Sequence, residues 1–113
     1  MRIYLSGPIS GHDDFMKEFQ RKAAGLSTFG CSVINPAPLS HCMPPDTSHE
    51  EYMKLSFCMI EMADIVCMCP GWELSMGANQ EYGYALAKGK VIKEFWDLVN
   101  WLRGINIKKE IEK

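Results

Sequence analysis

Residues 64–72 read Asp-Ile-Val-Cys-Met-Cys-Pro-Gly-Trp, and this stretch decides the fold class. The apolar run after Asp64 is continuous, which is typical of a central parallel strand covered by helices on both faces. Pro70-Gly71-Trp72 breaks the run as a turn, and a helical period follows it. The stretch therefore predicts the centre of a parallel sheet.

The rest of the chain alternates short apolar runs with helical periods, the pattern of βαβ units. We expect strands at residues 3–5, 32–35, 64–69 and 91–92, and helices at residues 13–29, 48–63, 75–89 and 95–102. Asp13 or Asp14 is expected to cap the first helix, and Ser48 with Glu51 fits a capping box for the second. Residues 36–47 hold four prolines and no period, so they are expected to form a loop, and the charged C-terminal end is expected to fray.

Right-handed crossovers between these elements predict a doubly wound, three-layer α/β sheet with strand order 2-1-3-4. We expect one domain over residues 1–113, with a core at about 1–93 and a helical tail at 94–113. The strand order reverses between the first and third strands. A ligand crevice is therefore expected where the loops after Leu5 and Cys69 meet.

The composition of the chain limits the kinds of partner that it is expected to bind. The 113 residues carry a formal net charge of -2, with 47% hydrophobic and 23% charged residues, so a single globular core is expected. A weakly acidic chain without a basic stripe is not expected to bind polymeric nucleic acid, although a small anion can still bind at a helix N-terminus. No apolar run approaches the length of a membrane span or a signal peptide, so no membrane partner is expected.

Five cysteines, with no CxxC pair, predict reduced thiols and a cytoplasmic protein. Two groups are candidate metal ligands: His41, Cys42 and His49 lie near one another in a loop, and Cys67 and Cys69 share one strand face. Neither group has a recognised zinc spacing. We therefore expect no metal and no other cofactor.

The expected crevice lacks a GxGxxG fingerprint, a P-loop and a GxSxG elbow. It does bring Glu81 into the early part of the third helix. There the positive end of the helix dipole is expected to keep the carboxylate ionised, as suits attack on an anomeric carbon with a covalent glycosyl intermediate. The alternative is that Glu81 is a solvated helix residue.

Three stretches carry a family resemblance: Ile3-Tyr4-Leu5-Ser6-Gly7-Pro8-Ile9-Ser10-Gly11, Asp64-Ile65-Val66, and Ser75-Met76-Gly77-Ala78-Asn79-Gln80-Glu81-Tyr82-Gly83-Tyr84-Ala85. Together they resemble the nucleoside 2-deoxyribosyltransferase superfamily over roughly the first 92 residues. The likeness is greatest to its small phage and bacterial branch, and it extends to the deoxynucleoside 5′-monophosphate N-glycosidases. The resemblance implies a flavodoxin-like or Rossmann-like sheet, a homodimer and a small nucleoside or nucleotide as substrate. It also implies an N-glycosidase or 2-deoxyribosyltransferase activity.

The resemblance also implies roles for individual residues. Glu81 would be the nucleophile, and Tyr4 would hold its carboxylate; the alternative for Tyr4 is a core position. Trp72 would stack on a base or, alternatively, pack beside its turn. The residues expected to contact the sugar, base or 5′-phosphate are Ser6, Gly7, Pro8, Ile9, Ser10, Gly11, Trp72, Ser75 and Gly77.

Two positions depart from the family pattern. Ser56 stands where the family has an aspartate that helps the base to leave, and Ser10 stands where the monophosphate hydrolases have a phosphate-binding arginine. Because a serine hydroxyl is a poor acid near neutral pH, a substitute would have to come from Glu73, Asp46 or His41. Two other functions therefore remain open: a nucleotide-binding or sensing domain without turnover, and an interaction domain with an unused crevice.

Overall fold

Four parallel strands form one sheet in the order β2-β1-β3-β4, which confirms the predicted topology. The computed structural model describes residues 1–9 and 14–112, with side chains to residue 105. The strands are β1 (Arg2–Ser6), β2 (Ser32–Ile34), β3 (Ile65–Met68) and β4 (Val91–Glu94). All four strands run in the same direction, so their carboxyl ends lie along one edge of the sheet. That edge is where ligands of such sheets bind.

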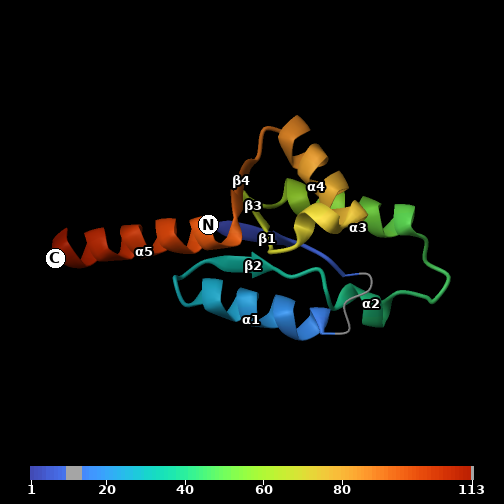
Figure 1. The fold of residues 1–113 in the computed structure, drawn as a ribbon, viewed down its shortest axis with the longest axis horizontal. Coiled ribbons are helices and arrows are strands. Elements are labelled where there is room, and N and C mark those ends of the chain that lie inside the picture. The colour runs from blue at the N-terminus through green and yellow to red at the C-terminus, as the bar shows by residue number, and fades with distance from the viewer. Residues whose placement is uncertain (10–13, 113) are drawn as a thin grey trace.

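Helices cover both faces of the sheet (Figure 1). On one face, α1 (Phe15–Ser27) and α5 (Phe95–Glu112) pack against Ile3 and Leu5 of β1. On the other face, α3 (His49–Glu61) and α4 (Met76–Ala87) pack against Tyr4. Successive residues of a strand point to opposite faces, so β1 sends its apolar side chains to one core and Tyr4 to the other. The three-layer prediction is confirmed.

Side chains near the N-termini of two helices cap them. Ser48 and Glu51 form the predicted capping box of α3, each side chain bonding the backbone of the other. Ser75 caps α4 by accepting a hydrogen bond from the Ala78 amide at 3.2 Å. Asp14 precedes α1 without a side-chain cap bond, and Asp13 lies outside the described residues. The two caps fix the start of the helices that line the site described below.

Three segments differ from the prediction. The proline-rich region contains a short helix, α2 (Leu39–Cys42), because the fixed φ of Pro38 suits the start of a helical turn. Residues 72–74 after β3 form a 3-10 turn, η1 (Trp72–Leu74), rather than a plain break. The backbone of α5 stays helical to Glu112 instead of fraying after residue 102, since the charged C-terminal residues are good helix formers.

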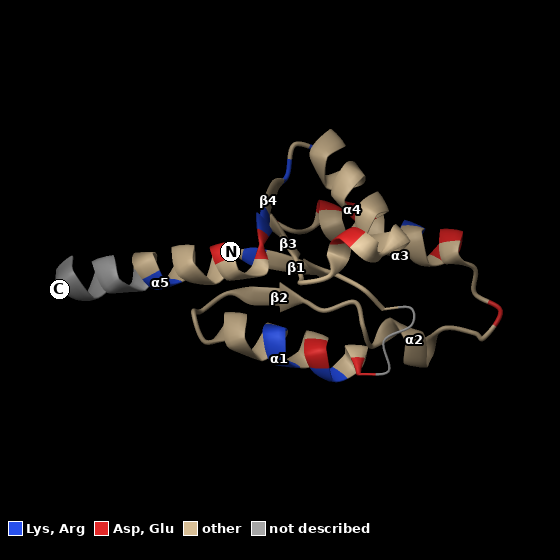
Figure 2. Cartoon of the chain, viewed as in Figure 1, with Lys and Arg blue, Asp and Glu red and all other residues tan. Residues whose placement is uncertain are grey.

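Charged residues of both signs are interspersed along the described chain and are not gathered in one basic segment (Figure 2). On α1, for example, Glu18 pairs with both Arg21 and Lys22. None of the helices, over the described residues, combines the length and apolar character needed to cross a bilayer.

Candidate active site

A cavity of about 240 Å³ opens on the α3 and α4 side of the sheet, at the carboxyl end of β1. Its walls come from β1 and the loop that follows it, from the segment after β2, and from one face each of α3 and α4. Glu81 of α4 and Tyr4 of β1 are both among the lining residues. The predicted crevice therefore exists at the expected edge, with Ile9 from the loop after β1 and Ser75 from the segment after β3 in its lining, and the segment after β2 contributes to it as well.

Glu81 is buried in this cavity, with only 6% of its surface exposed. The Tyr4 hydroxyl donates a hydrogen bond to Oε2, and the Ser6 hydroxyl donates one to Oε1 at 3.0 Å. Ser56 also reaches the carboxyl from α3 with its hydroxyl. The alternative in which Glu81 is a solvated helix residue is therefore wrong, because both carboxylate oxygens are held by neighbouring elements.

The protonation of Glu81 also differs from the prediction. Burial raises the pKa of its carboxyl to about 7, although hydrogen bonds from Tyr4, Ser6 and Ser56 act in the opposite direction. The expectation of a carboxylate kept ionised by the helix dipole is wrong for two reasons. Glu81 lies beyond the first turn of α4, where the dipole acts, and desolvation disfavours its charged form. Near neutral pH, Glu81 is thus poised between its two forms.

Tyr4 is a reliable donor to this carboxyl. Burial raises the pKa of its phenol well above the usual value, and the nearby charge of Glu81 raises it further. Tyr4 therefore stays protonated whenever Glu81 is ionised, and its O–H remains available to the carboxylate. Tyr4 is at once a core residue and a partner of Glu81, so the two alternatives for this residue do not compete.

The other predicted site residues are divided between locations. Four of them line the cavity around Glu81, and these are Gly7, Ile9, Ser75 and Gly77. Pro8 lines a different cavity, described below. The ring of Trp72 stacks on Tyr82, with centroids 5.0 Å apart, and lies outside the lining of the Glu81 cavity. Ser10 and Gly11 fall outside the described residues.

Gly7 has a steric reason to be glycine. A Cβ atom at this position would lie 2.9 Å from Cys69 Cβ, closer than such atoms approach one another in proteins. The missing side chain lets the loop after β1 run tightly along the end of β3, where the Cys69 amide donates to the Ser6 carbonyl at 2.7 Å. This contact fixes the backbone immediately after Ser6.

Sequence reasoning missed the contribution of α3. His49, Tyr52 and Met53 from this helix line the cavity together with Ser56. Residues 49, 53 and 56 are four and three positions apart, which is the spacing of one helix face, so the signal was present in the sequence. None of the three substitute acids considered above, Glu73, Asp46 and His41, is among the lining residues.

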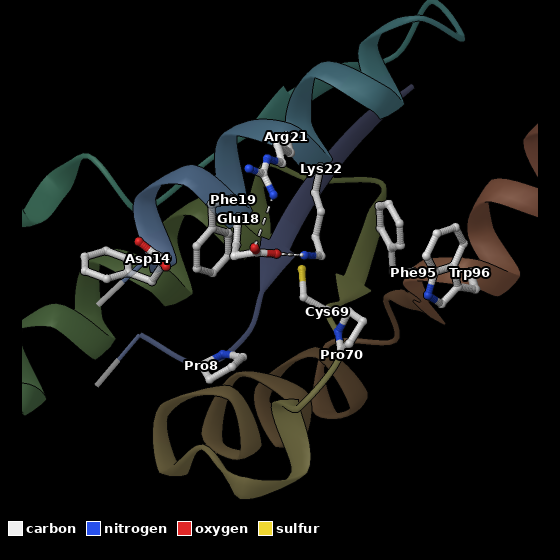
Figure 3. Close-up of a pocket in the computed structure, with 11 residues that line it drawn as sticks. Pro8, Asp14, Glu18, Phe19, Arg21, Lys22, Cys69, Pro70, Phe95 and Trp96 are labelled. Carbon is white, nitrogen blue, oxygen red and sulfur yellow. Dashed lines mark hydrogen bonds and ion pairs between the residues drawn. The ribbon is translucent and has the colours of Figure 1, made fainter. Parts of the chain in front are cut away.

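A second cavity of about 800 Å³ lies on the opposite face of the sheet, between α1 and the start of α5 (Figure 3). Three of its charged side chains are paired with one another, since Glu18 binds Lys22 at 3.2 Å and Arg21 at 3.6 Å, and Asp14 also lines it. The Cys69 thiol points into it from the end of β3. Although larger, this cavity contains neither Glu81 nor Tyr4. Among the described residues, no three His, Cys, Asp or Glu side chains are placed to hold a metal ion.

The fold and cavity together define a class of protein: a doubly wound α/β domain with a buried glutamate at the carboxyl edge of its parallel sheet. The chain belongs to the domain family of unknown function DUF4406, whose model matches residues 1–94. No curated protein matches it. Among solved structures it is similar to the CMP N-glycosidase BcmB of Clostridium botulinum, with a TM-score of 0.57 and 24% sequence identity. The similarity covers 83% of this chain and 67% of that one, and it confirms the expected doubly wound α/β fold.

Proposed function

We propose that this protein cleaves the N-glycosidic bond of a small nucleoside or nucleoside 5′-monophosphate, with Glu81 as the nucleophile. The observation that carries the proposal is the buried Glu81 carboxyl, held by Tyr4 on one oxygen and by Ser6 on the other. A carboxylate fixed in this way is oriented for attack before the substrate arrives. The solved structure with the same fold is that of a CMP N-glycosidase, which supports the same class of chemistry here.

The reaction follows from the chemistry of the carboxylate. Ionised Glu81 attacks the anomeric carbon, the bond from that carbon to the base nitrogen breaks, and a glycosyl ester forms on the enzyme. Water then releases the sugar in a hydrolase, whereas a second base accepts it in a transferase. Tyr4 and Ser6 bind the carboxylate oxygens and keep the side chain in place between the two steps.

The dimensions of the cavity fit a small substrate. A volume of about 240 Å³ lies just below the usual range of about 300–1,000 Å³ for small-molecule pockets, so the cavity suits a molecule of about nucleoside size and not a larger one. Apolar side chains such as Met53 and Leu39 contribute to its wall beside the polar groups. A face of this kind accommodates a flat base, while Glu81 and its partners meet the sugar.

The test is incubation with a panel of ribo- and deoxyribonucleosides and their 5′-monophosphates, followed by chromatography for free base. We expect base release from at least one compound and its loss in Glu81→Gln, which keeps the shape of the side chain and removes its charge. Glu73→Gln is the matched control, because Glu73 is an exposed carboxylate outside the cavity. Adding a second free base separates transfer from hydrolysis. Full turnover in Glu81→Gln would refute the proposed nucleophile.

A binding or sensing domain without turnover is the second candidate. The position of Ser56 favours it, since this hydroxyl lies beside Glu81 where an acid would assist the departing base. Calorimetry with the same panel distinguishes the two functions. Saturable binding without release of base would support the second candidate.

A further inference from the structure

Departure of a nucleobase requires a proton, and the cavity must supply it if the proposed function is right. General acid catalysis contributes about 10²–10⁴ to such a rate. The Ser56 hydroxyl is too weak an acid, and the Tyr4 hydroxyl already donates to Glu81. The remaining titratable groups of the described lining are Tyr52 and His49, both from α3. Of these two side chains, histidine is the one whose proton exchanges readily near neutral pH.

The placement of His49 suits this task. Its Cε1 atom lies 3.6 Å from the position that a Cβ atom would occupy at Gly77. Gly77 and Glu81 are four residues apart on α4, so they share one face and are separated by about 6 Å along the helix axis. The imidazole therefore lies roughly one helical turn from the nucleophile, over the same cavity. Retaining glycosidases, which also form a covalent intermediate, hold their two catalytic carboxyl groups about 5–5.5 Å apart, which is close to this separation.

Gln80 holds the imidazole ring in this position. His49 Nε2 and Gln80 Oε1 are 2.7 Å apart, and an amide oxygen only accepts, so Nε2 carries a hydrogen in this pair. In the imidazolium form, Nδ1 carries the second proton and is the nitrogen that can give it away. The glutamine thus fixes both the orientation of the ring and the identity of the donating atom.

We infer, on the basis of the proposed function, that His49 is the acid that protonates the leaving base and that Gln80 is its positioning residue. As Glu81 bonds to the anomeric carbon, the electron pair of the carbon–nitrogen bond passes to the base. The base receives the proton from His49 Nδ1 and leaves as a neutral molecule. In the hydrolytic step, water attacks the glycosyl ester, Glu81 departs as carboxylate, and the proton of the water returns to His49 Nδ1.

The surroundings of His49 define the expected pH dependence. The titratable groups facing the same cavity are Tyr4 from β1, Tyr52 from α3 and Glu81 from α4, and the direct partner Gln80 is uncharged. The inferred mechanism needs Glu81 as a carboxylate and a proton on His49 Nδ1 at the same time, so base release should pass through a maximum with pH. The alkaline limb is the signature of His49.

The first experiment compares the parent with His49→Gln and, as a control, with His41→Gln. His41 is an exposed histidine outside the cavity lining. We expect His49→Gln to lower kcat/KM by about 10²-fold or more and to remove the alkaline limb, with no change in His41→Gln. Analogues with better leaving groups, 5-fluorouracil in place of uracil or N7-methylguanine in place of guanine, should recover most of the lost rate. An unchanged pH profile and no selective recovery in His49→Gln would overturn the inference and leave the proposed function standing.

Gln80→Glu tests the same inference without removing the histidine. A carboxylate 2.7 Å from Nε2 favours the imidazolium, so the alkaline limb should move upward by about one pH unit. An unmoved alkaline limb would overturn the assignment even if His49→Gln were poorly folded. If the parent releases no base from any compound while Glu81→Gln behaves identically, the proposed function fails and this inference fails with it.

Discussion

Replacing Glu81 by glutamine should stabilise the protein, and the gain should depend on pH. Burial raises the pKa of the Glu81 carboxyl to about 7, compared with 4.5 for the same group exposed to water. The folded state therefore holds this proton more tightly than the unfolded state does. Stability is lost as pH rises from about 4.5 through about 7, because the folded chain must then bury a charge.

The size of this effect follows from the same two values. The difference between the two pKa values corresponds to a decrease of about 3 kcal/mol in the free energy of unfolding. This decrease is complete above both pKa values and absent below them. Glutamine keeps the shape and cannot ionise. Glu81→Gln should therefore match the parent at about pH 4 and exceed it by up to about 3 kcal/mol at about pH 8.5.

Urea unfolding at the two pH values, followed by tryptophan fluorescence, measures the difference directly. Glu73→Gln provides the control, because it removes an exposed carboxylate from the same edge of the molecule. Groups that titrate equally in both proteins cancel when the two are compared at each pH. A gap between parent and Glu81→Gln that is the same at both pH values would refute the argument from desolvation.

Three further predictions concern the site and the assembly. Tyr4→Phe removes a hydrogen-bond donor to the Glu81 carboxylate and should lower kcat/KM by about 10- to 100-fold. It should also move the acidic limb of the pH–rate profile to higher pH, and an unmoved limb would contradict the role given to Tyr4. Ser56→Asp places a second carboxylate against Glu81, so it should also raise the pKa of Glu81 and reduce base release at neutral pH, as a pH–rate profile would show. The protein should be a homodimer by light scattering at tens of micromolar, since Trp96 and Trp101 on α5 are 63% and 41% exposed, and a glutamate at both positions should yield monomer.

The sequence was sufficient for the topology because the relevant signals are local. The continuous apolar run of β3 and the alternation of short strands with helices determine a parallel sheet, and crossover handedness then fixes the strand order. The position of Glu81 at the carboxyl edge followed from the same pattern. Its protonation did not, because desolvation depends on how closely β1 and α3 approach α4, and no local pattern records that distance.

The lining of the cavity was only partly predictable. The sequence predicts a helix over residues 48–63 but does not single out the face that carries His49, Met53 and Ser56. The regular spacing of residues along a helix defines each of its faces, but only the fold shows which face lines the cavity. For Trp72 the sequence left two alternatives open, and the structure shows the packing one, with the ring stacked on Tyr82.

Two of the donors to Glu81, Tyr4 and Ser6, come from a single strand, and this has a consequence for how the site can change. Tyr4 and Ser6 are two residues apart on β1, on the same face, in the middle of the sheet. The opposite wall of the cavity comes from α3 and from the segment after β2, which do not set the position of those donors. The support of the nucleophile thus comes from β1, whereas α3 carries both the proposed acid His49 and part of the wall. On the proposed function, substitutions in the segment after β2 can therefore change the preferred base while Glu81 and its supports on β1 stay intact.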